Sequence, residues 1–271
     1  MSKGSLPAPA LCLALLAAAL AGAARGQAGD DVLPLSRFEA ADVGKSVPSG
    51  WKELTFNPSK FPKKSTYEVV RLDGRIVLKA STQGGVSALY RPLNVDPKEY
   101  PYLAWRWRAD NRYPGVDQRT KAGDDYPARV YIAFRYVSAR VGWFTRLEYD
   151  LARRRSREGQ YPPLYALNCV WANTARVNTW FPNPWQDRAK MIVVRTGAKG
   201  LKEWHQEARN YLADFKAIVG EEPTPVEYVA VMIDGDGSGS SGTSYFADIE
   251  LRKTPPPGFE RGAFQPPKEA D

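Results

Sequence analysis

Hydrophobic and polar residues alternate with a period of two along most of the chain. In residues 103–108 the two tryptophans, Trp105 and Trp107, fall on one side, and Arg106 and Arg108 fall on the other. A strand turns successive side chains to opposite faces, so this pattern predicts a β-strand with one buried face. Similar runs, rich in Val, Ile, Tyr and Trp, predict strands at 67–70, 75–80, 86–93, 129–134, 164–171, 191–195, 228–234 and 245–251.

One segment, residues 201–219, has helical periodicity instead. Apolar residues from Trp204 to Phe215 recur at spacings of three or four, and Gly220 is a stop signal just beyond them. Many short strands with one helix predict an all-β fold. We expect a two-sheet antiparallel β-sandwich of the jelly-roll type.

The two ends of the chain differ from its body. Residues 1–24 combine a basic start with a long apolar run that ends in small residues, as a secretory signal peptide does, and cleavage is expected after residue 24 or as late as 28. Residues 30–253 then form a single β-sandwich domain, and residues 254–271, rich in Pro, Gly and charge, form a flexible tail. We therefore expect an exported protein, periplasmic or extracellular, with no transmembrane segment in the mature chain.

The charge of the chain is modestly basic, with 38 Lys and Arg against 30 Asp and Glu and a net charge of +8. The densest basic cluster, Arg153 to Arg155, falls in an expected connection at 138–162. The cluster is either part of a solvated loop or a contact for acidic glycan or anionic lipid. No nucleic-acid motif is present, so we expect no nucleic-acid partner. We also expect the protein to be a monomer. The single mature cysteine, Cys169, cannot form an internal disulfide and predicts a buried, unreactive thiol.

Strand parity predicts one polar sheet face. If the tryptophans of residues 103–108 face the core, the neighbouring arginines project from the opposite face, and the same parity applies to residues 129–134 and 228–234. Guanidinium and carboxylate groups suit sugar hydroxyls or a substrate carboxylate. The alternative is an internal ion-pair network without a ligand. The residues predicted for this binding face are Arg106, Arg108, Asp124, Asp125, Arg129, Tyr131 and Asp234.

Aromatic residues in the connection at 173–188 provide a second candidate. Trp180 and Trp185 are predicted to stack on sugar rings, since exposed indoles are rigid platforms for such contacts. The alternative is that they close the end of the sandwich as additional core residues.

Enzyme chemistry has less support than binding. Asp124 with Asp234, or Asp125 with Glu148, offers an acid and a base for glycan hydrolysis, and Arg129 with Tyr131 suits a lyase. The chain has one histidine and no nucleophile elbow, which disfavours a hydrolase triad and a typical zinc site. A structural envelope protein without a ligand is the third alternative.

Several segments resemble a family described as domain of unknown function 3047, which has no assigned activity. The resemblance covers nearly the whole mature chain. One departure is the glycine-rich stretch after Asp234, for which we expect a more flexible loop. The matching segments are Phe38-Glu39, Gly50-Trp51, 77–81, 103–108, 123–131, Trp204, 207–210, Asp214, 233–236 and 247–249.

The outer pattern also resembles galactose-binding-like jelly rolls. That resemblance implies carbohydrate binding and a structural calcium ion at Glu39 and Asp248, with no other cofactor. The sequence thus predicts an exported β-sandwich that binds a carbohydrate or another cell-envelope component.

Overall fold

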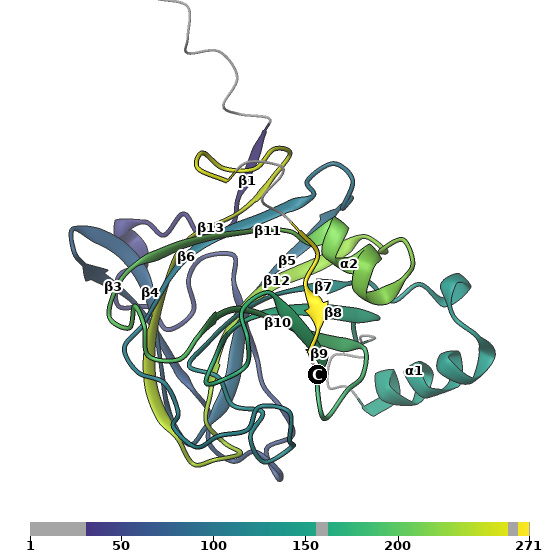
Figure 1. Ribbon diagram of the computed structural model, residues 1–271, viewed down its shortest axis with the longest axis horizontal. Coiled ribbons are helices and arrows are strands. Elements are labelled where there is room, and N and C mark those ends of the chain that lie inside the picture. Colours follow the sequence, from purple (N-terminus) through teal and green to yellow (C-terminus); the bar gives the residue numbers. More distant parts are fainter. Residues whose placement is uncertain (1–30, 156–161, 260–264, 271) are drawn as a thin grey trace, which may run out of the picture.

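The computed structural model describes residues 31–155, 162–259 and 265–270. The expected signal peptide lies outside the described residues. Two β-sheets stack face to face, as Figure 1 shows. No helix in the described ranges is long and apolar enough to cross a membrane.

The smaller sheet has six strands among the described residues, with β1 paired to β13 beside the main path. Its strands, in spatial order, are β11 (His205–Asn210), β6 (Tyr102–Ala109), β13 (Ser241–Arg252), β4 (Arg75–Gln83) and β3 (Thr66–Leu72), together with β1 (Val32–Pro34).

The larger sheet has eight strands in the described part of the chain. Two of its pairs, β8 with β10 and β9 with β14, are parallel, and the others are antiparallel. Its order is β14 (Lys268–Glu269), β9 (Thr179–Pro182), β10 (Ala189–Thr196), β8 (Tyr165–Ala172), β7 (Ala128–Phe134), β12 (Val226–Asp234), β5 (Val86–Val95) and β2 (Lys52–Leu54).

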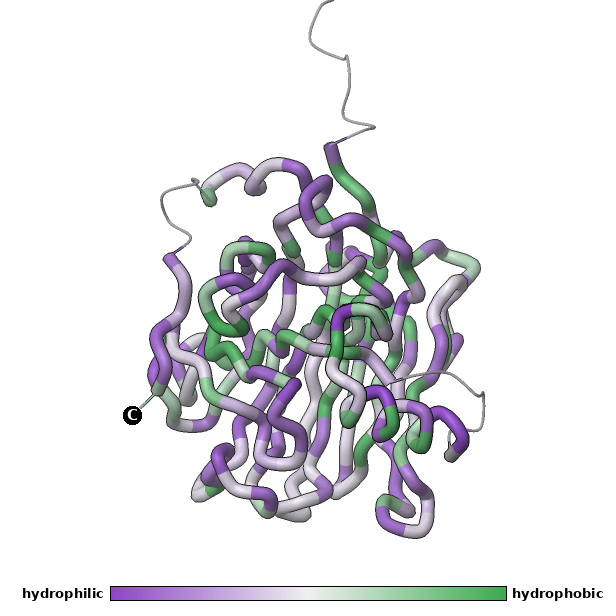
Figure 2. Tube along the Cα trace, turned by 90° about the vertical axis from the view of Figure 1, so that its right-hand side faces the viewer, coloured by the Kyte–Doolittle hydropathy of each residue, from purple (hydrophilic) through white to green (hydrophobic). Residues whose placement is uncertain are grey.

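The chain crosses repeatedly between the two sheets, from β5 to β6 to β7 and again from β10 to β13. This confirms the expected all-β sandwich of the jelly-roll class. Along the strands the hydropathy changes from residue to residue, because inward apolar side chains alternate with outward polar ones (Figure 2).

One continuous core fills the space between the sheets. Trp105 and Trp107 of β6 are completely buried, with their rings edge to face at 5.3 Å. From the larger sheet, Val130 and Ile132 of β7 enter the same cluster. The predicted inward faces of both strands are therefore confirmed.

The two strands belong to different sheets, however, which changes the position of their outward residues. Arg106 and Arg108 lie on the outer face of the smaller sheet, whereas Arg129 and Tyr131 lie on the outer face of the larger sheet. The expectation of one shared polar surface is wrong. Parity within a strand decides the direction of a side chain, but not the sheet to which the strand belongs.

The predicted helix at 201–219 is shorter in the structure. Helix α2 covers Tyr211–Val219, with the Asn210 side chain accepting a hydrogen bond from the Ala213 amide at 3.0 Å, and it ends at Gly220 with φ of 81°. The preceding residues form β11, because pairing with β6 satisfies backbone groups that would otherwise be left at a sheet edge.

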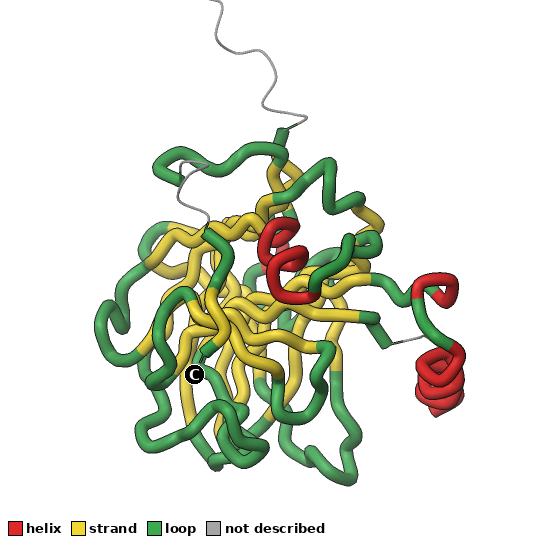
Figure 3. Tube along the Cα trace, turned by 45° about the vertical axis from the view of Figure 1, so that its right-hand side comes forward, coloured by secondary structure: helices red, strands yellow, loops and turns green. Residues whose placement is uncertain are grey.

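A second helix, α1 (Trp143–Arg155), lies where a loop was expected. Figure 3 shows that α2 lies against the strands, whereas α1 stands outside them. Two short 3₁₀ turns, η1 (Ala40–Asp42) and η2 (Ser138–Arg140), complete the described helical segments.

The end of the expected flexible tail is part of the larger sheet. β14 pairs with β9, and the Ala270 amide donates to the Trp180 carbonyl at 2.8 Å. Arg209 forms a bidentate ion pair with Asp214 at 2.6 and 2.8 Å and also donates to the Gln265 carbonyl. This buried pair therefore connects β11, α2 and the C-terminal segment.

Cys169 of β8 is 2% exposed in the core, and burial raises the pKa of its thiol. A buried neutral thiol is a poor nucleophile. We therefore expect a thiol reagent to label Cys169 only when the protein unfolds in urea, with the site of labelling identified by mass spectrometry. Rapid labelling of Cys169 in the native protein would contradict this packing.

Candidate functional site

A buried arginine lies at one end of the larger sheet. Arg129 of β7 is 4% exposed, and Asp234 at the end of β12 is 2% exposed. The Arg129 Nε donates to Asp234 Oδ1 at 3.1 Å, and the Nη2 donates to the other oxygen of the same carboxylate. The guanidinium also lies 4.3 Å from the centroid of the buried Tyr126 ring. Two adjacent strands thus form a bidentate ion pair, and an aromatic ring covers its guanidinium.

The loop before β7 adds further ligands to this cation. The Asp124 carbonyl accepts from Arg129 Nη2 at 2.5 Å, and Asp124 Oδ1 lies 3.4 Å from the same nitrogen. Burial raises the pKa of Asp124 and of Asp234, and the nearby guanidinium acts in the opposite direction. The loop is therefore attached to the sheet through charge, and removal of the cation would leave two buried carboxyl groups without compensation.

Asp125 connects the same loop to the glycine-rich turn after β12. It is 1% exposed and accepts from the Gly237 amide at 3.2 Å and the Ser238 amide at 2.6 Å. A Cβ atom at Gly237 would approach the Ala122 carbonyl oxygen to 2.7 Å, so only glycine permits this close packing. The loop that we expected to be more flexible is held by a buried carboxylate.

We call the set Asp124, Asp125, Arg129 and Asp234 the Arg129 network; three of its members are buried, and the Asp124 side chain is 10% exposed. The structure brings these four residues together: Asp124 and Asp234 pair with Arg129, and Asp125 accepts hydrogen bonds from backbone amides. In this arrangement the Asp124–Asp234 pair is closed to a substrate. The expected alternative of an internal ion-pair network describes this part of the face.

Tyr131, the fifth residue predicted for this face, packs farther along β7. It is 6% exposed, and its ring meets Tyr228 of β12 edge to face at 6.0 Å. It belongs to a small apolar cluster on the outer face of the larger sheet. Tyr131 is therefore a packing residue beside the network.

A groove of about 660 Å³ lies beside the Arg129 network. We call it the Trp185 groove after a side chain that lines it and is 49% exposed. The Lys60 Nζ lies 3.8 Å from the centroid of the Trp185 ring, and the Lys121 Nζ lies at 5.2 Å. Residues that line the groove include Lys60, Phe61, Lys63, Lys121, Trp185 and Asp236.

The network and the groove are joined by Asn183. Its Nδ2 donates to Asp124 Oδ2 at 2.7 Å. Its Oδ1 accepts from the backbone amides of Trp185 at 2.9 Å and Gln186 at 3.2 Å. The buried network therefore orients an amide side chain, which in turn shapes the turn that carries the exposed indole.

Trp180 differs from Trp185. It lies on β9, is half-buried and packs against the main core, and the Lys190 Nζ lies 5.4 Å from its ring centroid. Of the two predicted stacking residues, the structure exposes Trp185 on a groove and places Trp180 at the edge of the core. Lys60, Lys121 and Asn183 were missed by the sequence analysis, because they lie on loops with no alternating pattern.

Arg106 and Arg108 occupy a separate surface, on the smaller sheet. Arg106 lies 3.8 Å from Asp248, and Arg108 donates to Asp110 at 2.9 Å and lies 3.6 Å from Asp73. These two predicted ligand-binding residues are therefore engaged in partly exposed ion pairs, and neither of them lines the Trp185 groove.

The two residues predicted to bind calcium lie at the start of η1 and on β13, an inner strand of the smaller sheet. Glu39 is exposed at the start of η1, and the Asp248 carboxylate pairs with Arg75 at 3.1 Å as well as with Arg106. A calcium ion would compete with two guanidinium groups for Asp248. The calcium site stays a prediction.

A group of three carboxylates lies within the network and the groove. Oxygens of Asp125, Asp234 and Asp236 lie within 4.8 Å of one another. The oxygens of the first two already accept hydrogen bonds from Arg129 and from backbone amides, and burial raises the pKa of Asp236. The Arg129 guanidinium pairs with Asp234 of this group.

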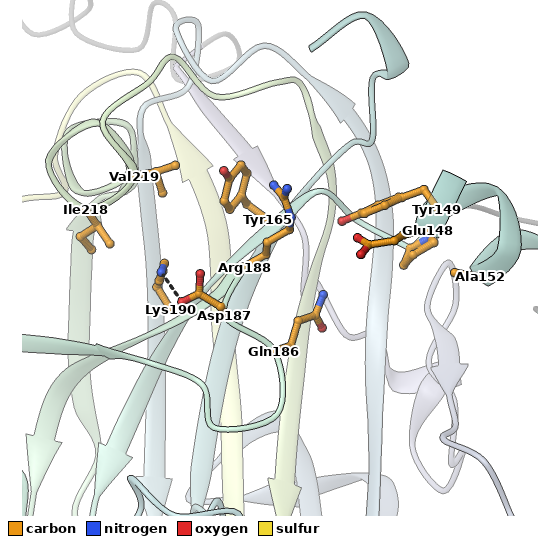
Figure 4. Close-up of a pocket in the computed structure, with 11 residues that line it drawn as sticks. Glu148, Tyr149, Ala152, Tyr165, Gln186, Asp187, Arg188, Lys190, Ile218 and Val219 are labelled. Atoms are coloured by element: carbon orange, nitrogen blue, oxygen red, sulfur yellow. Dashed lines mark hydrogen bonds and ion pairs between the residues drawn. The ribbon is translucent and has the colours of Figure 1, made fainter. Parts of the chain in front are cut away.

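A second pocket, of about 620 Å³, lies between α1, α2 and the larger sheet. Figure 4 shows Glu148 and Tyr149 of α1 on one wall, with Arg188, Asp187 and Lys190 facing them from the other elements. The Asp187 side chain is 85% exposed and pairs with Lys190 at 3.1 Å. Glu148, which we considered as a partner for Asp125, thus lies in a different pocket from the Arg129 network.

Comparison with known proteins identifies a family. The model of the family described as "Protein of unknown function (DUF3047)" matches residues 49–250. A search of curated proteins finds no match.

Two solved structures show distant likenesses to this chain. A family 11 carbohydrate-binding module of a cellulosomal cellulase from Clostridium thermocellum is 10% identical, with a TM-score of 0.38, and the match covers 83% of this chain and 94% of the module. A family 11 xylanase from Neocallimastix patriciarum is 11% identical, with a TM-score of 0.37, and the match covers 77% of this chain and 97% of the xylanase. Likenesses of this size say nothing of what this chain binds.

The Arg129 network generates a stability prediction. Arg129→Met leaves Asp124 and Asp234 buried without their cation, so we expect the free energy of unfolding to fall by about 3–5 kcal/mol in urea titrations. The matched change on the outer face of the smaller sheet, Arg106→Met, removes a partly exposed pair and is expected to cost less than about 1 kcal/mol.

The pH dependence of the difference in stability between the wild type and Arg129→Met tests the role of the charge. Without the guanidinium, the raised pKa values of Asp124 and Asp234 are unopposed, and a raised carboxyl pKa adds stability at low pH that is lost as the pH rises. The stability gap between the wild type and Arg129→Met should therefore widen as the pH rises above about 4, the aspartate pKa in the unfolded chain. A gap that is constant with pH would show that the arginine acts only by packing.

Proposed function

We propose that this chain, which belongs to the DUF3047 family, binds a carbohydrate in the Trp185 groove, and that the preferred ligand is an acidic glycan. The observation that carries the proposal is an exposed indole with two lysine ammonium groups beside its ring, on loops anchored by a buried ion-pair network.

The exposed ring of Trp185 supports stacking on a sugar. A pyranose presents a face of C–H groups to an aromatic ring, and an indole supplies a large rigid surface with little loss of conformational entropy. The lysines that now lie beside the ring are held by cation–π contacts worth only ~0.5–1 kcal/mol at an exposed site. A sugar ring can therefore displace them from the indole without a large penalty.

The charges around the groove favour an anionic sugar. Lys60, Lys63 and Lys121 line it, against one carboxylate, Asp236. An ammonium displaced from the ring is well placed to pair with a uronate carboxylate on the stacked sugar. This charge balance separates the proposed ligand from neutral β-glucans.

The anchoring of the groove also supports the proposal. Asn183 connects Asp124 to the backbone of the turn that carries Trp185, so the position of this turn is set before a ligand arrives. A preorganised platform loses less entropy on binding than a mobile one.

Binding to soluble uronate oligomers tests this function. We expect oligogalacturonate or alginate oligomers to bind more tightly than cellohexaose in calorimetric titrations. Trp185→Ala should weaken binding of the uronate by about tenfold, which corresponds to ~1.4 kcal/mol. Lys60→Ala with Lys121→Ala should remove the preference for acidic over neutral oligomers and the dependence of affinity on salt.

The control is Trp143→Ala, which removes another exposed indole outside the groove. It should leave glycan affinity unchanged. If no acidic or neutral glycan binds, or if Trp185→Ala has no effect, the groove is not a carbohydrate site.

We also propose that the protein is exported and acts as a monomer in the periplasm or outside the cell. The basic and apolar pattern of residues 1–24 supports export. Intact-mass measurement of protein recovered from an exporting host should give a chain that begins at Arg25 or Gly29. A recovered chain that retains residues 1–24 and remains in the cytoplasm would contradict export.

A further inference from the structure

Helix α1 carries a face of exposed hydrophobic side chains. Trp143 is 64% exposed, Phe144 66%, Leu147 53% and Leu151 44%. At about 100° per residue, these four side chains fall within an arc of about 100° around the helix axis. Among the described residues, the other exposed large hydrophobic side chains are scattered over separate loops and turns. We call this arc the apolar face of α1.

The helix is attached to the body by its opposite side. The Tyr149 ring stacks on Tyr136 with centroids 4.3 Å apart, and its hydroxyl donates to the Pro163 carbonyl at 3.0 Å. These two tyrosines and Leu164 form a separate buried cluster. Because Tyr149 faces the body and the four apolar side chains are exposed, the apolar face of α1 is directed toward solvent. Figures 1 and 3 show α1 standing outside the strands.

Basic side chains lie within this apolar face and along one flank of it. Arg146, Arg153 and Arg154 are exposed, and the helix sequence holds more arginines than acidic residues. On the helical projection, Arg154 lies among the apolar residues and the other two lie at the flank. An arginine stem can lie along apolar surroundings while its guanidinium reaches polar groups.

We propose that α1 docks the protein on the surface of an anionic lipid bilayer. The apolar face enters the boundary between headgroups and acyl chains, and the arginines pair with lipid phosphates. With 13 residues the helix is about 20 Å long, too short to span a bilayer, so it lies in the plane of the interface.

Charge favours a bilayer over a second copy of the chain as the occupant of this face. Self-association through α1 would bring two net-basic helices together, whereas an anionic surface neutralises them. Trp and Phe in the first turn also suit the headgroup region, where amphipathic aromatic rings gather.

Co-sedimentation with lipid vesicles tests this inference. The protein is recovered from an exporting host, its N-terminus is determined, and it is mixed with vesicles of phosphatidylglycerol and phosphatidylcholine or of phosphatidylcholine alone. We expect binding to the anionic vesicles, with a blue shift of tryptophan emission. The double variant Trp143→Ser and Phe144→Ser should bind at least about tenfold more weakly.

Charge and fold are controlled with further variants. Arg146→Gln with Arg154→Gln should weaken binding to anionic vesicles severalfold, whereas Trp185→Ser, a matched loss of an exposed indole elsewhere, should have no effect. Urea unfolding of each variant, followed through Cys169 labelling, checks that the fold is retained. Because these residues contact solvent, we expect unfolding midpoints close to that of the wild type.

Two results would overturn the proposal. The first is equal binding of the wild type and of the Trp143→Ser and Phe144→Ser variant. The second is a dimer in analytical ultracentrifugation that this variant dissociates, without any vesicle binding, which would assign the face to a second copy. Glycan affinity is measured on soluble oligomers without lipid, so failure here leaves the carbohydrate proposal separately testable.

Discussion

The buried guanidinium of Arg129 is the interaction on which the loop end of the larger sheet depends. It pairs with Asp234 on the neighbouring strand and with Asp124 on the preceding loop, while Asp125 holds the turn after β12. A cation at this depth is stable only when paired, and the carboxylates in turn require the cation. The loops are therefore fixed by mutual charge compensation, in addition to the hydrophobic packing that joins the two sheets.

This constraint separates the buried ion-pair network from the surface for which we propose a ligand. The charged groups that first suggest a binding site are enclosed, and they act through Asn183 on the exposed Trp185. The groove is exposed to solvent, and the turn that carries Trp185 is held in place by the buried network. The apolar face of α1 follows a different principle, since its hydrophobic residues are exposed and Tyr149 on the opposite side attaches the helix to the body.

Strand faces could be predicted from local pattern, and their grouping in space could not. The inward direction of Trp105 and Trp107 follows from alternation, as does the outward direction of Arg129. Alternation does not say that β6 and β7 lie in opposite sheets, so Arg106 and Arg129 were assigned to one surface. Helix α1 carried a usable signal, because Trp143, Leu147 and Leu151 recur every four residues. Residues 205–210 had helical spacing, but the need of β6 for a backbone partner made them a strand.

The sequence by itself determined the fold class, the inward faces of the main strands and the association of Asp124, Arg129 and Asp234 with one candidate region, because side-chain alternation is a local property of the chain. Only the tertiary structure decided that this region is closed, that Trp185 is exposed while Trp180 packs on the core, and that Lys60 and Lys121 lie beside the indole. These outcomes depend on loops distant in sequence meeting at one end of the sheet, and no local periodicity encodes such a meeting.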